Sequence, residues 1–291
     1  MSTFAESAKF TQNPLEKGII ELYASYNPVL RYMGFENIAG DSKEWNMEKT
    51  LPDVGFRGVN TDWTDSEGEY DTKTASLKIM GGRAKVDRFI EATQGNGTST
   101  LKREINQKVK AASLFYLKEF FNGDVTVETQ GFDGLNKLIA AGGGVLVDNG
   151  TAALTLKVLD NFIDSLQGDP SCLLMSKRSI RIVNDLMRSA GQATETITDQ
   201  FGRRLNAYAG IPMEAVEVDN EYNAILGVDD IYAVRFGADG CHGFQHGPLT
   251  TMKVENSGVW QAQDIEWYAT GPVLRHPKCA GRLTGLVDPD A

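Results

Sequence analysis

The chain has 291 residues and a formal net charge of −10, from 29 Lys and Arg against 39 Asp and Glu. Hydrophobic residues make up 41% and charged residues 23%, which is typical of a folded domain and excludes a disordered chain. No apolar run reaches the roughly 18 residues that span a bilayer, so we expect no membrane protein. Because an acidic chain repels phosphates, we also expect no general nucleic-acid binder.

The cysteines indicate a reducing compartment. Cys172, Cys241 and Cys279 are too few and too widely spaced for a disulfide framework. The N-terminus lacks the basic and apolar regions of a signal peptide, so we expect a protein made in a cytoplasm and not exported.

Residues 1–40 predict an extended N-terminal arm. Its first 14 residues contain Phe4, Phe10 and little else that is apolar, so this part cannot form a core alone. Pro14 predicts the start of one short helix, and Asn27-Pro28 predicts its end.

Residues 41–82 predict a long two-stranded projection. Polar and apolar residues alternate from Lys43 to Lys49 and again from Tyr70 to Ile79, as they do in strands. A long polar stretch with glycines, Asp53 to Glu69, lies between them. An isolated hairpin is only marginally stable, so we expect this one to lie on a neighbouring molecule.

Residues 100–122 carry the strongest helical pattern in the chain. Apolar residues recur there every three or four positions, and Asn122-Gly123 predicts the C-terminal end. The first half of this helix carries the one basic cluster found in the sequence, Lys102, Arg103, Lys108 and Lys110. Such a cluster is typical of a solvated helix face, and non-specific contact with nucleic acid stays open as the alternative.

The remainder predicts a mixed α+β fold without a regular βα repeat. The expected elements are a short helix over 135–140, a strand over 145–147, an amphipathic helix over 154–166, a buried strand over 172–175, a helix over 177–189, an edge-like strand over 213–218, a central strand over 231–236, and further strands around Ile265, Trp267 and Val273.

No motif in the sequence specifies catalysis or cofactor binding. Gly142-Gly143-Gly144 and Gly95-Asn96-Gly97 lack the residues that complete a phosphate-binding loop. Cys241, His242 and His246 have the spacing of a zinc site only if they are helical, and the glycines around them disfavour a helix. We therefore expect structural or surface histidines, and no catalytic, cofactor-binding or metal-binding residues.

Several segments, in their order along the chain, resemble the major capsid proteins of tailed bacteriophages, which have the Hong Kong 97-type fold also found in encapsulins. These segments are Leu51 to Asn60, Gly81 to Ile90, the helix 100–122, Phe132 to Leu135, Leu173 to Ser176, Gly210 to Pro212, Tyr232 to Gly237 and Glu266 to Tyr268.

The resemblance implies a particular division of the chain. It comprises an N-terminal arm (1–40), an extended β-hairpin loop (41–82), a peripheral domain (83–167) with its spine helix (100–122), an axial domain (168–250) and a return to the peripheral sheet (251–291). The implied protein is not an enzyme.

The resemblance also implies partners and a location. Copies of the chain would form hexamers and pentamers of an icosahedral shell around double-stranded DNA, in contact with that DNA non-specifically and with a portal. We expect scaffolding to be a separate protein or absent, because no long charged helical extension precedes the arm, and decoration proteins are further possible partners. The protein would be made in the host cytoplasm and reside in the virion, with no membrane and no cofactor.

A specific assembly hypothesis follows from charge and aromatic content. The hairpin tip is acidic and would dock on basic residues of the adjacent subunit, with aromatic side chains as buried anchors. The candidate interface residues are Phe4 and Phe10 of the arm, Phe56, Arg57, Asp62, Trp63, Asp65, Glu67 and Glu69 of the tip, and Lys102, Arg103 and Lys108 of the helix.

Two other functions stay open at this point. The same fold would serve an encapsulin-type compartment, which neighbouring cargo genes would identify. A metal-dependent hydrolase or nuclease would use His242, His246 and nearby acids, and metal-dependent turnover would identify it.

Overall fold

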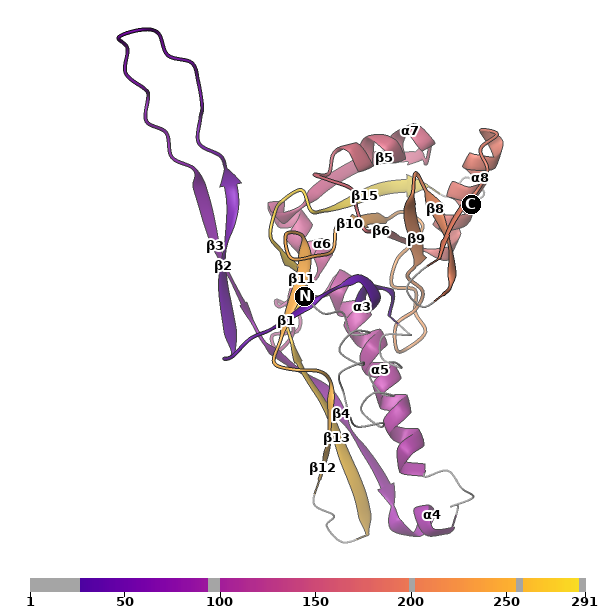
Figure 1. Ribbon diagram of the computed structural model, residues 1–291. Coiled ribbons are helices and arrows are strands. Elements are labelled where there is room, and N and C mark those ends of the chain that lie inside the picture. The colour runs from indigo at the N-terminus through magenta and orange to yellow at the C-terminus, as the bar shows by residue number, and fades with distance from the viewer. Residues whose placement is uncertain (1–26, 94–99, 199–201, 255–258, 288–291) are drawn as a thin grey trace.

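The computed structural model describes residues 27–93, 100–198, 202–254 and 259–287. A body of two β-sheets and several helices carries a long hairpin that projects far from it (Figure 1). Phe4, Phe10 and most of the predicted arm lie outside the described residues. None of the described helices is both long and apolar enough to span a bilayer.

The helices and strands alternate irregularly along the chain, as expected for an α+β fold. The helices are α3 (Pro28–Tyr32), α4 (Arg88–Thr93), α5 (Thr100–Asn122), α6 (Leu135–Leu138) with a π-helical turn (Ile139–Gly143), α7 (Leu156–Asp164) and α8 (Lys177–Ser189). The strands are β1 (Phe35–Asn37), β2 (Ser42–Thr50), β3 (Glu69–Ser76), β4 (Lys78–Asp87), β5 (Val145–Ala153), β6 (Cys172–Met175), β7 (Glu195–Thr198), β8 (Arg204–Tyr208), β9 (Ile211–Ala215), β10 (Ile231–Val234), β11 (Cys241–Gln245), β12 (Thr250–Lys253), β13 (Trp260–Ala269), β14 (Val273–Leu274) and β15 (Ala280–Val287).

The long helix α5 packs against a six-stranded sheet. This sheet has the order β1-β11-β13-β12, with β14 paired to β11 and β4 paired to β13. Tyr116 of α5 lies against Trp267 of β13 at a ring-centroid distance of 5.0 Å, and Phe35 of β1 meets the same indole at 5.1 Å. All three rings are buried, so helix, sheet and the segment leaving the arm share one aromatic core.

The polar atoms of this core are paired. The hydroxyl of Tyr116 donates to the carbonyl of Thr270 at 3.2 Å, and the indole nitrogen of Trp267 donates to Oε1 of Gln245 at 3.1 Å. Burying these donors without partners would cost free energy, so the two bonds allow aromatic residues with polar groups to occupy the interior.

The second sheet has seven strands in the order β5-β15-β10-β6-β9-β8-β7. Helices α7 and α8 contribute Leu159, Phe162 and Val183 to a second apolar cluster, together with Leu173 and Ile231 of the sheet. Strand β10 lies centrally, as predicted. Strand β9 lies between β6 and β8, so the expectation of an edge-like strand over 213–218 is wrong.

Each of the two sheets draws strands from several of the expected parts of the chain. Strand β5 and helix α7 of the range 83–167 belong to the seven-stranded sheet, and of the range 251–291, β13 pairs with β4 in the six-stranded sheet while β15 lies between β5 and β10. Conversely, β11 of the range 168–250 pairs with β1 and β13. Residue alternation identifies a strand but not the distant strand with which it pairs.

The helix α5 has the predicted bounds, and its buried face includes Ile105, Val109, Tyr116 and Phe120. Ser113 is also buried on this face, where its carbonyl accepts a hydrogen bond from the Asn27 side chain at 3.1 Å. The helix α8 likewise has the predicted bounds.

Asn27 begins the helix α3, whereas the helix predicted to run from Pro14 to Asn27 lies outside the described residues. The side-chain oxygen of Asn27 accepts hydrogen bonds from the backbone N–H groups of Val29 and Leu30, and Pro28 occupies the first helical position of α3. The same Asn-Pro pair fits both a stop and an N-cap, and the structure shows its role as an N-cap.

A buried ion-pair network ties α3 to the seven-stranded sheet. Nη1 of Arg31 donates to Oε1 of Glu214 at 2.8 Å, and Arg203 and Tyr32 donate to the same oxygen at 3.2 and 3.3 Å. A buried carboxylate is tolerated only when it is paired, so these donors fix where the chain leaves the arm.

The projecting hairpin consists of β2 and β3, which pair from Ser42 opposite Ser76 to Thr50 opposite Glu69. Its root packs on the body through Trp45, Ala75 and Leu77. The paired region is shorter than the predicted range 41–82, because β4 begins at Lys78 and pairs with β13. The alternating pattern continues across Leu77, so it does not reveal this change of partner.

Two adjacent glycines of β4 test the packing of this strand. A Cβ atom on Gly81 would lie 1.9 Å from the carbonyl oxygen of Ile265, whereas on Gly82 it would meet only the flexible end of Lys108 at 3.7 Å. We expect Gly81→Ala to destabilise the protein by about 1–3 kcal/mol, since β4 and β13 would have to separate. Gly82→Ala is the matched control and should unfold like the wild type. Equal unfolding temperatures for both variants would contradict the close approach.

Candidate assembly surfaces

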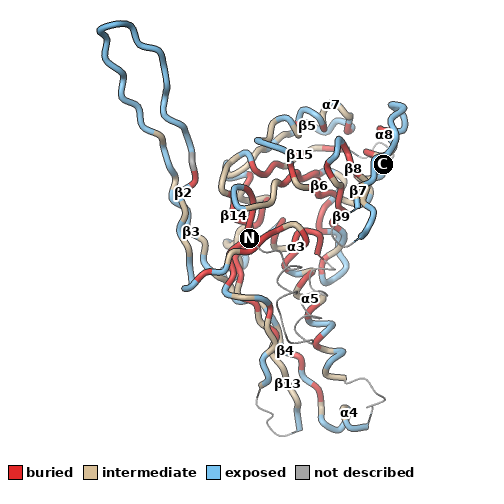
Figure 2. The backbone as a smooth tube through the Cα atoms, viewed as in Figure 1, coloured by how far each residue is buried: buried red, intermediate tan, exposed pale blue. Residues whose placement is uncertain are grey.

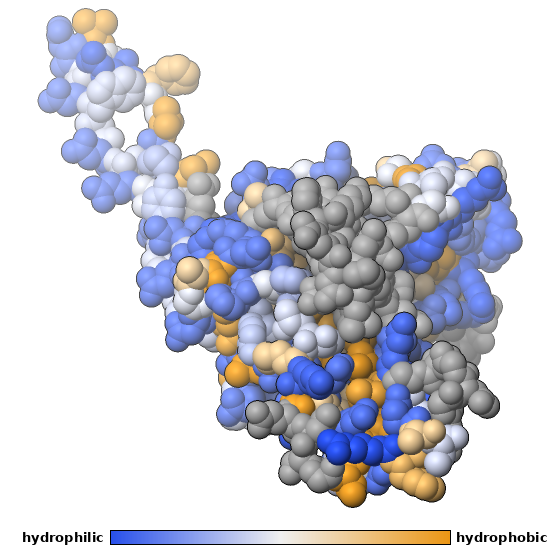
Figure 3. Space-filling model, turned by 60° about the horizontal axis from the view of Figure 1, so that its bottom comes forward, coloured by the Kyte–Doolittle hydropathy of each residue, from blue (hydrophilic) through white to orange (hydrophobic). Residues whose placement is uncertain are grey.

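The hairpin tip, defined as residues 51–68, extends beyond the last pairs of β2 and β3. Every residue from 51 to 67 is exposed, as the pale blue end of the tube shows (Figure 2). Phe56 is fully exposed and Trp63 is 61% exposed. Apolar side chains stand among hydrophilic ones on this tip, well away from the body (Figure 3). Large apolar groups gathered at one exposed end mark a contact surface.

Local contacts give the tip a defined shape. The Arg57 guanidinium lies 5.6 Å from the ring of Trp63 and donates to the carbonyl of Thr61 at 2.9 Å. The hydroxyl of Thr61 donates back to the carbonyl of Gly58 at 2.8 Å, and Asn60 takes the positive φ of 65° that this turn requires. The predicted Arg57 and Trp63 therefore lie together, while Phe56 is separate from this contact.

The acidic residues of the tip divide into two groups. Glu69 begins β3 and pairs with Lys49 across the hairpin at 2.9 Å, which raises the pKa of Lys49. Asp62, Asp65 and Glu67 are exposed and form no ion pair with the part of the chain that the structure describes. These three carboxylates, and not Glu69, are the acids that a partner would meet.

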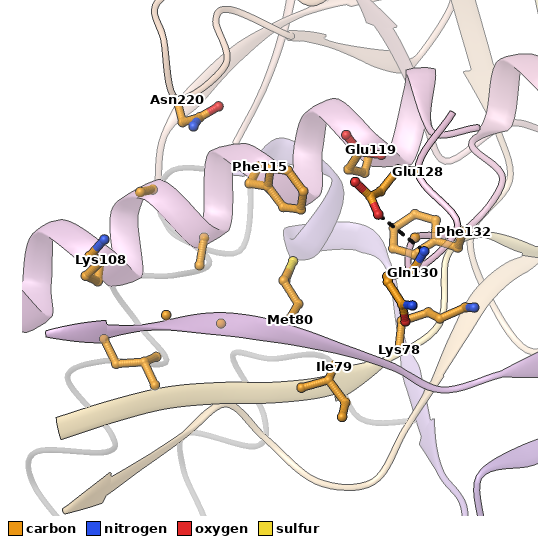
Figure 4. Close-up of a pocket in the computed structure, with 16 residues that line it drawn as sticks. Lys78, Ile79, Met80, Lys108, Phe115, Glu119, Glu128, Gln130, Phe132 and Asn220 are labelled. Carbon is orange, nitrogen blue, oxygen red and sulfur yellow. Dashed lines mark hydrogen bonds between the residues drawn. The ribbon is translucent and has the colours of Figure 1, made fainter. Parts of the chain in front are cut away.

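A groove of about 370 Å³ runs between α5 and β4, closed at one end by the turn that contains Phe132. Phe115 from the helix and Met80 from the strand point toward each other across it (Figure 4). Side chains of both β4 and β13, including Met80 and Ile265, line the groove beneath the helix. The groove therefore offers apolar side chains from a helix and from a sheet.

Charged residues line the ends of this groove. Lys108 lies at one end, and Lys78, Glu119 and Glu128 lie toward the other (Figure 4). Burial raises the pKa of the Glu119 carboxyl, and the neighbouring Lys118 opposes this effect only in part. A ligand for the groove therefore needs an apolar middle and at least one acid near Lys108.

The three basic residues predicted as alternative docking partners of the tip lie on different sides of α5. Lys108 lines the groove with Ala111, Ala112 and Phe115, which follow it at helical spacing. Lys102 and Arg103 precede Lys108 by six and five residues, which places them on other sides of the helix. They therefore do not line the groove. Charge alone does not distinguish Lys108 from Lys102 and Arg103. The groove was not predictable from the sequence, because it depends on the pairing of β4 with β13.

The residues considered for metal chemistry also lie apart. On strand β11, Cys241 joins the main core while His242 lies on the opposite face against Phe244, at a ring-centroid distance of 5.1 Å. Nδ1 of His246 donates to the carbonyl oxygen of Ile38 at 3.2 Å. Within the described ranges, no three His, Cys, Asp or Glu side chains converge in a way that would hold a metal ion.

Solved structures show which fold this arrangement is, whereas no known family profile and no curated protein matches the chain. The SrpI encapsulin of Synechococcus elongatus superposes with a TM-score of 0.68 at 14% identity, covering 90% of this chain and 89% of its own. The capsid of an empty GTA particle gives 0.63 at 13% identity, with 90% of each chain covered.

A phage protein gives the same result. The structure of Mycobacterium phage Bobi superposes with a TM-score of 0.63 at 14% identity and covers 89% of this chain and 90% of its own. The chain therefore has the fold that phage capsids share with encapsulins. It is the Hong Kong 97-type fold, as the resemblance implied.

The cysteines give a chemical test of the core. Cys172, Cys241 and Cys279 are all buried, and burial raises the pKa of each thiol. Because the thiolate is the reactive form, we expect native protein to resist alkylation by a maleimide at neutral pH and unfolded protein to take up three labels. Mass spectrometry measures both. Rapid labelling of the native chain would contradict this burial.

Proposed function

We propose that this chain is a major capsid protein, whose copies form the hexamers and pentamers of an icosahedral shell. The observation that carries this proposal is the hairpin tip, which exposes Phe56 and Trp63 at the end of a projection that its own body does not cover. The likeness of the fold to capsids over about nine-tenths of their length supports the same role.

Burial of the tip on another copy would stabilise both. Apolar surface contributes about 25 cal/mol per Å² when it leaves water, and aromatic anchors dominate such contacts. A tip of one subunit that docks on the body of the next is a heterologous contact, which closes into rings when the rotation closes.

The groove between α5 and β4 is the acceptor that best suits this tip. Its apolar middle, Phe115 and Met80, suits an aromatic anchor, and Lys108 suits the carboxylates of Asp62 or Asp65. Opposite charges at the ends of the groove would determine the register in which the tip docks more than the affinity of docking.

The proposed contents of the shell are double-stranded DNA of a tailed phage. Phage and GTA capsids among the similar structures support this content. A net charge of −10 lets the shell enclose DNA without holding it tightly. A portal, a scaffolding or decoration protein, synthesis in the host cytoplasm and residence in the virion belong to this proposal.

A second candidate is an encapsulin-type compartment. The superposition with the SrpI encapsulin favours it, since its TM-score of 0.68 exceeds those of the phage and GTA capsids compared above. Particles purified from the native source distinguish the two, because packaged DNA raises the ultraviolet absorbance ratio and is degraded by nuclease once the shell is opened. Shells that contain a protein cargo and no DNA would support the compartment instead.

Trp63→Ala tests the anchor. We expect the variant to lose closed shells in negative-stain electron microscopy, because truncating a central aromatic anchor costs about 2 kcal/mol or more at each contact. Tyr222→Ala, at a side chain that is 74% exposed on the body, is the matched control and should assemble normally. Shells of Trp63→Ala that are as abundant and as stable as those of the wild type would refute the anchor role.

Lys108→Glu tests the groove. We expect this reversal to raise the protein concentration needed for assembly about tenfold, which corresponds to about 1.4 kcal/mol per contact. Arg103→Glu makes the same charge change on the same helix away from the groove, so it should assemble near the wild-type concentration. Light scattering against concentration measures both. Equal effects of the two reversals would indicate a general charge effect and not a groove contact.

A further inference from the structure

The hairpin root contains a compact group of charged and aromatic side chains around the ring of Phe244. We define the root cluster as Glu36 of β1, Lys43 and Trp45 of β2, His242 and Phe244 of β11, and Arg275, which follows β14. These residues connect the hairpin to three segments of the body. Residues 51–67 of the tip, at the far end of the hairpin, are all exposed (Figure 2).

Two cationic side chains lie close to the Phe244 ring. Nζ of Lys43 lies 5.1 Å from its centroid and Cζ of Arg275 lies 5.8 Å from it. The ring of Trp45 approaches at 6.0 Å, so β2 contacts Phe244 through both an ammonium and an indole. Anything that pushes Lys43 away from this ring loosens the hairpin.

One carboxylate balances these cations. Glu36 pairs with Lys43 and lies 3.8 Å from Nη2 of Arg275. The hydrogen bond from Lys43 is the main cause that lowers the pKa of Glu36. The cluster therefore holds two positive charges and one negative charge while His242 is neutral.

His242 is a buried, poorly solvated base beside these charges. Its exposed fraction is 0%, and neither ring nitrogen has a hydrogen-bond partner of normal geometry among the described residues. The backbone of Gly240 and the carboxylate of Glu36 favour the charged ring, but burial, Arg275 and Lys43 oppose it. Nδ1 and Nε2 therefore lack the partners that an imidazolium would require.

We propose that His242 makes the seating of the hairpin acid-sensitive: a proton on its ring adds a third cation to the root cluster and releases β2 from Phe244. The driving force is the repulsion among His242, Lys43 and Arg275 together with the desolvation of the charged ring. The release frees the hairpin to change its angle to the body while the two sheets stay folded.

The direction of the pH dependence follows from the pKa of His242. Burial first, and then Arg275, lower this pKa from 6.5 to about 4. Above pH 6.5 the ring is neutral whether the hairpin is seated or released, so seating is unaffected. As the pH falls from 6.5 toward 4, the released state takes up the proton first, and the ratio of seated to released hairpins falls by roughly 100-fold.

Glu36 acts over a lower range. Because the pKa of Glu36 is lowered, its ion pair with Lys43 stabilises the root fully at any pH above the ordinary carboxyl pKa. This stabilisation is lost as the pH falls through the lowered pKa of Glu36. A change observed at about pH 5 to 6 therefore reports on His242 and not on Glu36.

Hydrogen–deuterium exchange of the full-length chain tests the proposal. Exchange is measured at about pH 7 and pH 5 and corrected for the intrinsic rate, in peptides covering β2 and β3 near the root and in α5 as an internal reference. We expect faster exchange at pH 5 in the hairpin root alone. His276→Gln, a histidine outside the root cluster, should keep this response, and His242→Phe should abolish it. An unchanged root in the wild type, or the same response in His242→Phe, would overturn the proposal.

A second measurement does not depend on the variant folding. The chain has three histidines, so their ring resonances can be followed by NMR as the pH is lowered. We expect one of them to titrate near pH 4 and to share its midpoint with the chemical-shift change of the Trp45 indole. Three histidines that all titrate near pH 6.5 would refute the proposal.

Discussion

The packing of Trp267 against Tyr116 and Phe35 is the contact on which the rest of the structure depends. It joins the long helix, the six-stranded sheet and the chain emerging from the arm at one buried point, with both polar donors satisfied. Because α5 is held there, its outer face stands opposite β4 and leaves the groove between them. The groove proposed for assembly is therefore a consequence of how the core is packed.

The two ends of the hairpin have opposite character. The root is packed on Phe244 and Val273, whereas the tip exposes its aromatic residues and keeps its shape through a few local bonds. A projection of this kind is folded, but it leaves apolar surface uncovered at its end. The packing of the root determines the position of the tip, and the side chains of the tip determine which surface it can bind.

Sequence reasoning succeeded where the determining information is local. The helices α5 and α8 have the predicted bounds because their periodicity and end signals lie within the segment. The exposed aromatic and acidic residues of the tip were likewise recognisable, since a long polar stretch cannot bury them. Sheet order was not predictable, because β9 and β15 pair with strands far away in the sequence. For the same reason the groove, and the separation of Lys108 from Arg103, appeared only in the structure.

Strand β4 also has a mechanical consequence. It follows β3 with Leu77 alone between them and runs antiparallel to β13 through ten registered pairs, from Lys78 opposite Ala269 to Asp87 opposite Trp260. A tension applied along the hairpin therefore loads this ladder lengthwise, so its hydrogen bonds share the force in shear instead of breaking one after another. A chain built in this way bears tension through its backbone without relying on the side chains at the root.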